Sequence, residues 1–143
     1  MKLASTIFLV FAIIIGQAQN IEIDIQRQTT IGGVEYGANV LIGKGKVALG
    51  YSIQNGLKTA TEYTDTNHRF QGMIVKLPIR TCEKLSLFFT PRIGFVAEQF
   101  FVVLPELKLY LPLIGNIDLN LGSGIRYGQP SVSLGLSYSP SKL

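Results

Sequence analysis

The sequence predicts an all-β fold, an eight-stranded antiparallel up-and-down transmembrane β-barrel preceded by a cleaved signal peptide. Three observations predict it. Residues 85–111 carry apolar side chains at alternate positions over two arms, each longer than an average soluble strand. The positions between them carry charges and small residues, as in the interior of a membrane barrel. The chain is 47% hydrophobic, yet it has no apolar run of the length that a transmembrane helix needs.

The first residues have the features of a secretory signal peptide. Lys2 gives a positive start, residues 7–15 are apolar, and Gly16 and Ala18 are small residues at the usual cleavage positions. We expect residues 1–18 to be removed and residues 19–143 to form one outer-membrane β-barrel domain. A retained anchoring helix is the less favoured alternative, because the apolar run is about half the length that a bilayer needs.

The alternation continues along the chain and defines eight strands. They cover residues 21–28, 34–42, 47–54, 69–78, 85–96, 100–111, 117–127 and 131–138. Turns rich in Gly and Pro separate most of them, for example at residues 43–45, 112–115 and 128–130. Residues 57–68 lose the alternation and form the one long loop. With both termini in the periplasm, this loop lies outside, which agrees with long outer loops and short inner turns.

One face of the strands is apolar and is expected to contact lipid. The clearest lipid-facing side chains are Leu87, Phe89, Leu107, Leu109, Leu119 and Leu134. An arginine at Leu119 should cost about 2 to 4 kcal/mol if this position lies near the bilayer midplane. Four tyrosines, Tyr36, Tyr51, Tyr127 and Tyr138, fall on the same face. They suit either the headgroup region or simple β-propensity.

The opposite face gathers most of the charged side chains of the strands. They are Glu22, Asp24, Glu35, Lys76, Arg92, Glu106, Lys108, Asp118 and Arg126. Ionisable groups in a narrow lumen must be paired, because an isolated charge loses solvation worth several kcal/mol. We therefore expect a lumen ion-pair network that plugs the barrel, since eight strands enclose little more than their own side chains. A charged conduit or binding pocket is the alternative.

The long loop is a candidate surface recognition site, because loops on a rigid scaffold commonly carry recognition. Its candidate contact residues are Thr59, Thr61, Glu62, Tyr63, Asp65 and His68. These side chains suit a surface partner, a sugar or a cation. A solvated loop without a ligand is an equal alternative.

The side chains of most enzyme and metal sites are scarce. The chain has one histidine, His68, and one cysteine, Cys82, which are too few for a zinc site or an internal disulfide. Strand serines such as Ser52 and Ser131 have no neighbouring base in the sequence. We expect no enzyme activity, cofactor or bound metal, with a membrane-embedded lipid hydrolase as a remote alternative. Lysine and arginine form no dense run, so no nucleic-acid partner is expected despite the net charge of +4.

These features resemble the small outer-membrane β-barrel proteins of Gram-negative bacteria, the OmpX/OmpA-type group, and especially the short β-barrel-domain proteins of Bacteroidota. The resemblance covers about residues 20–139 and rests on the signal peptide and the segments LSLFFTPRIGF, IDLNLGSGIRYG and SVSLGLSY. It implies an outer-membrane location, insertion by the barrel-assembly machinery, contact with outer-membrane lipid and a monomeric state. A structural or surface-interaction role follows, with residues 57–68 as the candidate site for an extracellular partner.

Two other functions fit a small barrel. A soluble lipocalin-like barrel would carry an apolar ligand inside, and a narrow pore would conduct through a hydrated lumen. A lipocalin buries apolar residues in its cavity and shows charge outside. Here the charges lie opposite the continuous apolar stripe, which favours the membrane barrel.

Overall fold

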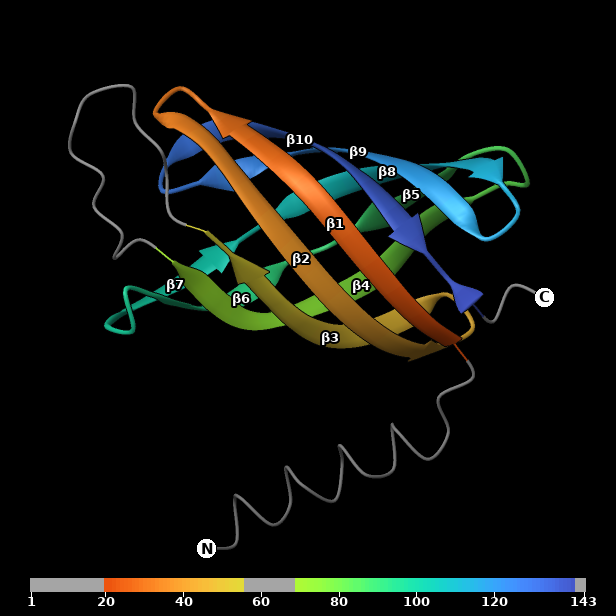
Figure 1. Cartoon of the computed structure of the whole chain (residues 1–143), viewed down its shortest axis with the longest axis horizontal. Helices are drawn as coiled ribbons and strands as arrows, with labels where there is room; N and C mark the ends of the chain where they lie inside the picture. The colour runs from red at the N-terminus through yellow and green to blue at the C-terminus, as the bar shows by residue number, and fades with distance from the viewer. Residues whose placement is uncertain (1–19, 56–68, 141–143) are drawn as a thin grey trace, which may run out of the picture.

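The protein is described by a computed structural model over residues 20–55 and 69–140. The expected signal peptide, residues 1–18, and the expected loop, residues 57–68, lie outside these ranges. Ten β-segments make up the described chain (Figure 1). They are β1 (Asn20–Thr30), β2 (Gly33–Lys44), β3 (Val47–Gln54), β4 (Phe70–Thr81), β5 (Ser86–Phe89), β6 (Arg92–Val96), β7 (Phe100–Leu104), β8 (Glu106–Ile114), β9 (Ile117–Arg126) and β10 (Gln129–Tyr138).

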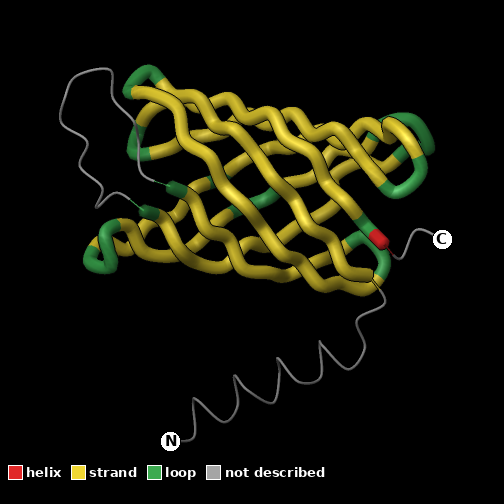
Figure 2. Tube along the Cα trace, in the orientation of Figure 1, coloured by secondary structure: helices red, strands yellow, loops and turns green. Residues whose placement is uncertain are grey.

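The segments form one closed antiparallel barrel. Neighbours along the sheet follow the order β3-β2-β1-β10-β9-β8-β5-β4-β6-β7, and an additional β3–β4 pairing closes the circle. The first and last strands pair directly, from Ile23 opposite Tyr138 to Thr30 opposite Ser131. Because β5 continues into β6 and β7 into β8, the wall has eight strands, and the predicted eight-stranded barrel is confirmed. Figure 2 shows strand covering almost the whole wall.

Both arms of the long hairpin are interrupted, although the alternation predicts each as one unbroken strand. The breaks fall at Thr90–Pro91 and at Pro105. Proline has no backbone N–H and cannot donate to the sheet ladder, so regular pairing stops there. Isolated backbone hydrogen bonds connect the neighbouring strands at these breaks. The Thr90 N–H donates to Glu106 O at 2.7 Å, and the Val75 N–H donates to Pro91 O at 3.1 Å.

Several turns lie a few residues from their expected positions. A turn was expected at residues 112–115, and this was wrong for residues 112–114. Strand β8 continues to Ile114, and the turn consists of Gly115 and Asn116. A register shift between Pro112 and Ile114 accommodates the proline. Gly115 supplies the positive φ of 55° that this turn requires. Tyr127 also differs, since it occupies a turn with a φ of 51° and not an outward strand position.

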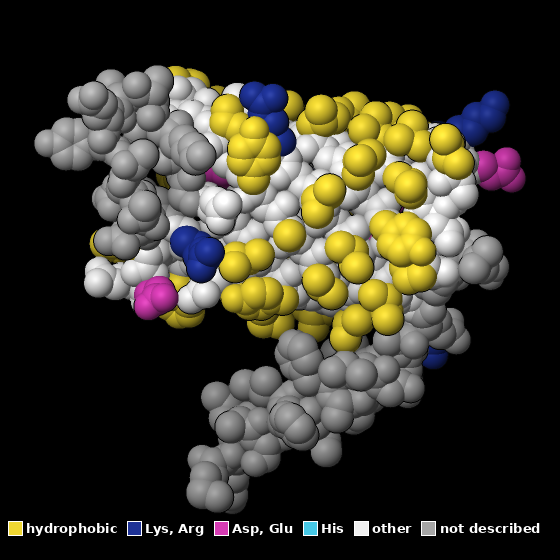
Figure 3. Space-filling view, viewed as in Figure 1, with side chains coloured by type: hydrophobic (Ala, Val, Ile, Leu, Met, Phe, Trp, Pro, Cys, Tyr) yellow, Lys and Arg dark blue, Asp and Glu magenta, His cyan; other side chains and the backbone are white. Residues whose placement is uncertain are grey.

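The outer face of the barrel is predominantly apolar. Large hydrophobic side chains are exposed on nearly every strand, including Ile25 at 56%, Leu107 at 46% and Leu134 at 51%. Figure 3 shows them spread over the wall, with few acidic or basic side chains among them. The six side chains expected to face outward do so, and the inner positions between them are buried. The described residues contain no helix long and apolar enough to cross a membrane.

Candidate functional site

The strand alternation places all nine charged side chains of the expected network on the inner face. Eight of them are at most 7% exposed, and Glu22 is partly buried. They come from six segments: β1 (Glu22 and Asp24), β2 (Glu35), β4 (Lys76), β6 (Arg92), β8 (Glu106 and Lys108) and β9 (Asp118 and Arg126). Four direct ion pairs join eight of the nine. The lumen is therefore filled by charge that the chain itself compensates.

The layer nearest the termini holds the Lys76–Glu22 pair. The Lys76 ammonium lies 2.6 Å from one Glu22 carboxylate oxygen and 2.9 Å from the other. The same ammonium lies 3.7 Å from the centre of the Tyr110 ring and 4.5 Å from that of Phe88. A cation over aromatic rings gains electrostatic attraction in addition to its ion pair. Lys76 is thus held on three sides.

The middle layer is organised around Asp24. Its carboxylate accepts hydrogen bonds from Lys108 at 2.7 Å, Asn39 at 2.8 Å and Asn120 at 2.8 Å. These donors come from β8, β2 and β9, and Asp24 itself is on β1. Lys108 also donates to the Gln26 side chain. Such charge-assisted bonds offset the loss of water around a buried carboxylate.

The next layer holds two arginines. Arg92 pairs with Glu106 at 3.2 Å, and Arg126 pairs with Glu35. Both guanidinium groups donate to the carbonyl oxygen of Gln54, Arg92 at 2.7 Å. Gln28 accepts from Arg92 at 3.0 Å and from Gln54 at 2.7 Å. The amides thus link the two ion pairs into one network.

An apolar cluster closes the lumen at the end opposite the termini. Phe70, Val96 and Leu104 are each at most 6% exposed, and Ala97 and Val102 pack against them. Phe70 begins β4 and Val96 ends β6, so the cluster lies just inside the β6–β7 turn. This end is therefore sealed by hydrocarbon and not by charge.

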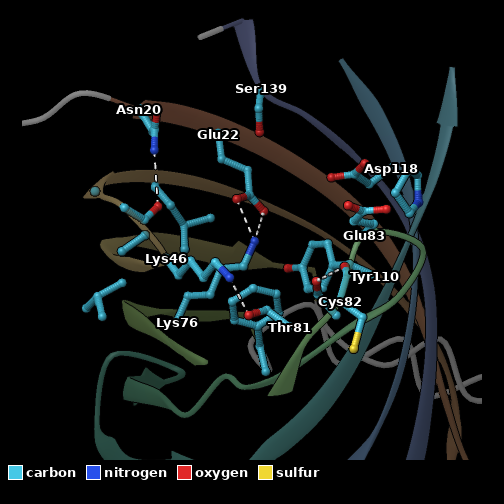
Figure 4. A pocket seen from close by; sticks show the side chains of 18 residues that line it. Asn20, Glu22, Lys46, Lys76, Thr81, Cys82, Glu83, Tyr110, Asp118 and Ser139 are labelled. Atoms are coloured by element: carbon cyan, nitrogen blue, oxygen red, sulfur yellow. Dashed lines mark hydrogen bonds and ion pairs between the residues drawn. The ribbon is translucent and has the colours of Figure 1, made fainter. Parts of the chain in front are cut away.

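The other end is hollowed into a vestibule, a cavity of about 270 Å³. Its lining includes Glu22, Lys46, Lys76, Tyr110, Asp118 and Cys82. Figure 4 shows the Glu22 carboxylate reaching from β1 to the Lys76 ammonium, with the Tyr110 ring beside them. At the rim, Lys46 donates to Thr81 and the Asn20 amide donates to Gly45 O at 3.1 Å. The vestibule ends at the Lys76–Glu22 layer, so it does not continue as an open channel.

Glycines leave room for the side chains and backbone that crowd the lumen. At Gly122 an added methyl group would overlap the Ser133 hydroxyl and the Glu106 carboxylate, which are hydrogen-bonded to each other. Gly72 and Gly94 face each other across β4 and β6, and a side chain on either would meet the other's backbone. Only glycine leaves the room that the narrow lumen requires at these positions.

The sequence did not single out the neutral members of the network. Gln28, Gln54, Asn39 and Asn120 are at most 1% exposed and each bonds to an ionised group or to another amide of the network. The strand alternation could have identified these amides, because it places them on the inner face. Tyr127 was expected on the outward face of a strand. It is 37% exposed but lies in the β9–β10 turn, where its hydroxyl accepts a hydrogen bond from Arg126 at 3.0 Å.

The expected recognition loop and the single cysteine are not part of the described lumen network. The loop candidates Thr59, Thr61, Glu62, Tyr63, Asp65 and His68 lie outside the described residues. Cys82 is a free, exposed thiol in the connection between β4 and β5. Within residues 20–55 and 69–140, no cluster of three or more His, Cys, Asp or Glu side chains is arranged to hold a metal ion.

Comparison with solved structures identifies the fold. The chain is similar to a de novo designed transmembrane β-barrel, with a TM-score of 0.69 and 8% identity over 85% of this chain and 96% of the other. It is similar to a second design, TMB2.3, with a TM-score of 0.66 and 8% identity over 83% and 92%. The Yersinia pestis outer membrane protein Ail, determined in a phospholipid bilayer nanodisc, gives a TM-score of 0.53 and 10% identity over 84% and 98%.

The sequence itself matches no family model and no curated protein. At such low identity, the structural likeness concerns the fold alone. The chain therefore has the fold of small transmembrane β-barrels, including that of an outer-membrane protein.

Proposed function

We propose that this chain is a small outer-membrane β-barrel with a structural or surface-interaction role and a lumen sealed by its own side chains. The observation that carries the proposal is the inversion of polarity across the wall. Charged and amide side chains are buried inside, and large apolar side chains are exposed outside on nearly every strand. A soluble protein rarely exposes an apolar surface of this extent. A bilayer is the environment in which it is stable.

The secretion route follows from this proposal. Residues 1–18 direct export across the inner membrane, and the barrel-assembly machinery inserts residues 19–143 as a monomer. The fold similarity to Ail supports an outer-membrane location. Transport through the lumen is not part of the proposed role, because three layers of bonded side chains and the Phe70 cluster fill it.

Purified monomer in planar bilayers should show no steady conductance. The ion pairs Arg92–Glu106 and Lys108–Asp24 cross the lumen between different strands, so ions would have to displace bonded groups to pass. Current should be recorded over a range of voltages, with a channel-forming porin in the same bilayers as the control. Steady single-channel steps from the monomer would replace the sealed-lumen proposal with that of a narrow pore.

The surface-interaction role is assigned to residues 57–68. Their flanking strands, β3 and β4, meet the segment at the end of the barrel opposite the termini (Figure 1). This is the outer end if both termini are periplasmic.

Replacing residues 58–67 with a short Gly-Ser turn should leave the barrel folded, because the paired strands and the lumen network are untouched. It should abolish capture of any surface partner from intact cells. A matched control replaces Glu98 and Gln99 with serine in the β6–β7 turn at the same end. Capture of the same partners by the replaced and parent proteins would show that the segment is not the site.

A further inference from the structure

One arginine stands apart on the outer face of the barrel. Among the described strand residues, three charged side chains point outward: Arg27 on β1, Lys44 on β2 and Arg80 on β4. Lys44 is the last residue of its strand and Arg80 is next to the last of its own. Arg27 has three further strand residues beyond it, up to Thr30. It therefore lies within the apolar wall and not at its edge.

No acidic side chain of the described strands compensates Arg27 on the outer face. The acidic residues of the described strands all point into the lumen, and Glu83 and Glu98 are in connections between strands. The direct cross-strand neighbours of Arg27 are Tyr36 on β2 and Leu134 on β10. An uncompensated arginine in hydrocarbon is unfavourable, and the cost falls toward the headgroups. Within residues 20–55 and 69–140 no acidic side chain of the outer face is available to Arg27, so we look to the surrounding bilayer for a counter-charge.

A shallow groove begins at this arginine. Its volume is about 590 Å³, and it is lined by Arg27 and Tyr36 together with Ile25, Leu119, Leu134 and Leu136. Ile25 pairs with Leu136, which pairs with Leu119, so these three side chains form the row next to Arg27 on the side of the termini. One end of the groove is thus cationic and hydrogen-bonding, and the rest is aliphatic.

The Arg27 guanidinium can reach lipid phosphates that lie level with the end of β1. With a rise of about 3.3 Å per residue and a tilt of about 45°, three residues place it about 7 Å below the end of β1. An extended arginine side chain spans this depth while its methylene groups stay in the apolar layer. The aliphatic part of the groove continues from there toward the bilayer centre, as an acyl chain does.

We propose that Arg27 and Tyr36 bind the phosphate of a phosphate-bearing lipid whose acyl chain lies along Leu134 and Ile25 toward the bilayer centre. The guanidinium fork supplies two parallel donors to phosphate oxygens, and the Tyr36 phenol can add a third. This inference rests on the proposed membrane location. It goes further by assigning one lipid to one place on the barrel.

The test uses the parent protein and variants reconstituted in phosphatidylcholine vesicles that contain a minor fraction of phosphatidic acid. Native mass spectrometry after release into mild detergent measures the fraction of barrels that retain one phosphatidic acid. Arg27→Gln should lower the retained fraction at least about tenfold, as expected for loss of a charge-assisted pair. Arg27→Lys should retain an intermediate fraction, because lysine keeps the charge but not the fork.

The matched control is Arg80→Gln, which removes the same charge from the outer face near the other end of the barrel. It should retain as much phosphatidic acid as the parent. Equal losses in the Arg27 and Arg80 variants, or no loss in either, would overturn the site. Excess inorganic phosphate should not displace the lipid, and displacement would overturn the role of the acyl groove. Failure of the parent to float with the vesicles would instead overturn the membrane proposal itself.

Discussion

Replacement of Lys108 by methionine is expected to lower the free energy of unfolding by about 3–5 kcal/mol. Lys108 is completely buried, and its ammonium lies 2.7 Å from the Asp24 carboxylate. Methionine preserves much of the side-chain volume but removes the positive charge that faces the Asp24 carboxylate. The carboxylate then keeps the neutral amide donors of Asn39 and Asn120. The cost arises from the uncompensated carboxylate more than from the lost attraction.

Urea titration of the barrel in detergent micelles measures this effect. The chain has no tryptophan, so far-ultraviolet circular dichroism and the electrophoretic mobility of the folded band should report unfolding. Lys84→Met, the same substitution at an exposed turn position, should change stability by less than about 0.5 kcal/mol. The double variant Asp24→Asn with Lys108→Met should be more stable than Lys108→Met alone. A single-variant loss below about 1 kcal/mol would contradict the charge-network account.

Replacement of Leu121 by arginine is expected to cost about 2–4 kcal/mol in a bilayer. Leu121 is 40% exposed on the outer face and lies between Leu109 and Leu134, halfway along β9 and β10. A guanidinium group at this depth must either enter hydrocarbon or deform the bilayer to reach water. The unfolding free energy of protein folded in lipid vesicles measures the cost.

Leu119→Arg provides the depth control. The sequence placed this position at a possible midplane, but the structure puts Leu119 two residues from the start of β9. Its arginine should therefore cost less than that at Leu121, because the headgroups are within reach. Equal costs at the two positions, or no cost at either, would mean that the outer face is not immersed as proposed.

The fold was predictable because a single repeated property specifies it. Each strand alternates between an apolar and a polar side chain, and this period identifies both the strands and their two faces. The ends of the strands were harder to predict, because a proline can end a strand, interrupt it or lie within it. Pro112 was expected in a turn but lies within β8, whereas Pro91 and Pro105 interrupt arms that were expected to be continuous.

The lumen was predictable as a set of residues but not as a set of bonds. The period fixes that Asp24 and Lys108 point inward. Which base meets which acid depends on the stagger of the strands around the barrel, which a local pattern does not contain. Asn39 could be paired with Asp24 only once β1 and β2 were in register, where the two residues are direct partners. The amides were missed because neutral inward side chains carry no demand for a counter-charge.

The bonds of Asp24 also have a consequence for the order of folding. Its three partners are 15, 84 and 96 residues away along the chain, and Gln28 reaches Ser131 at a separation of 103. Contacts this distant are costly in loop-closure entropy and form slowly. Pairing of β1 with β10 joins the first and last strands of the chain around these groups. Dehydration of the lumen and closure of the barrel are therefore one cooperative event, which completes only after the last strand has been synthesised.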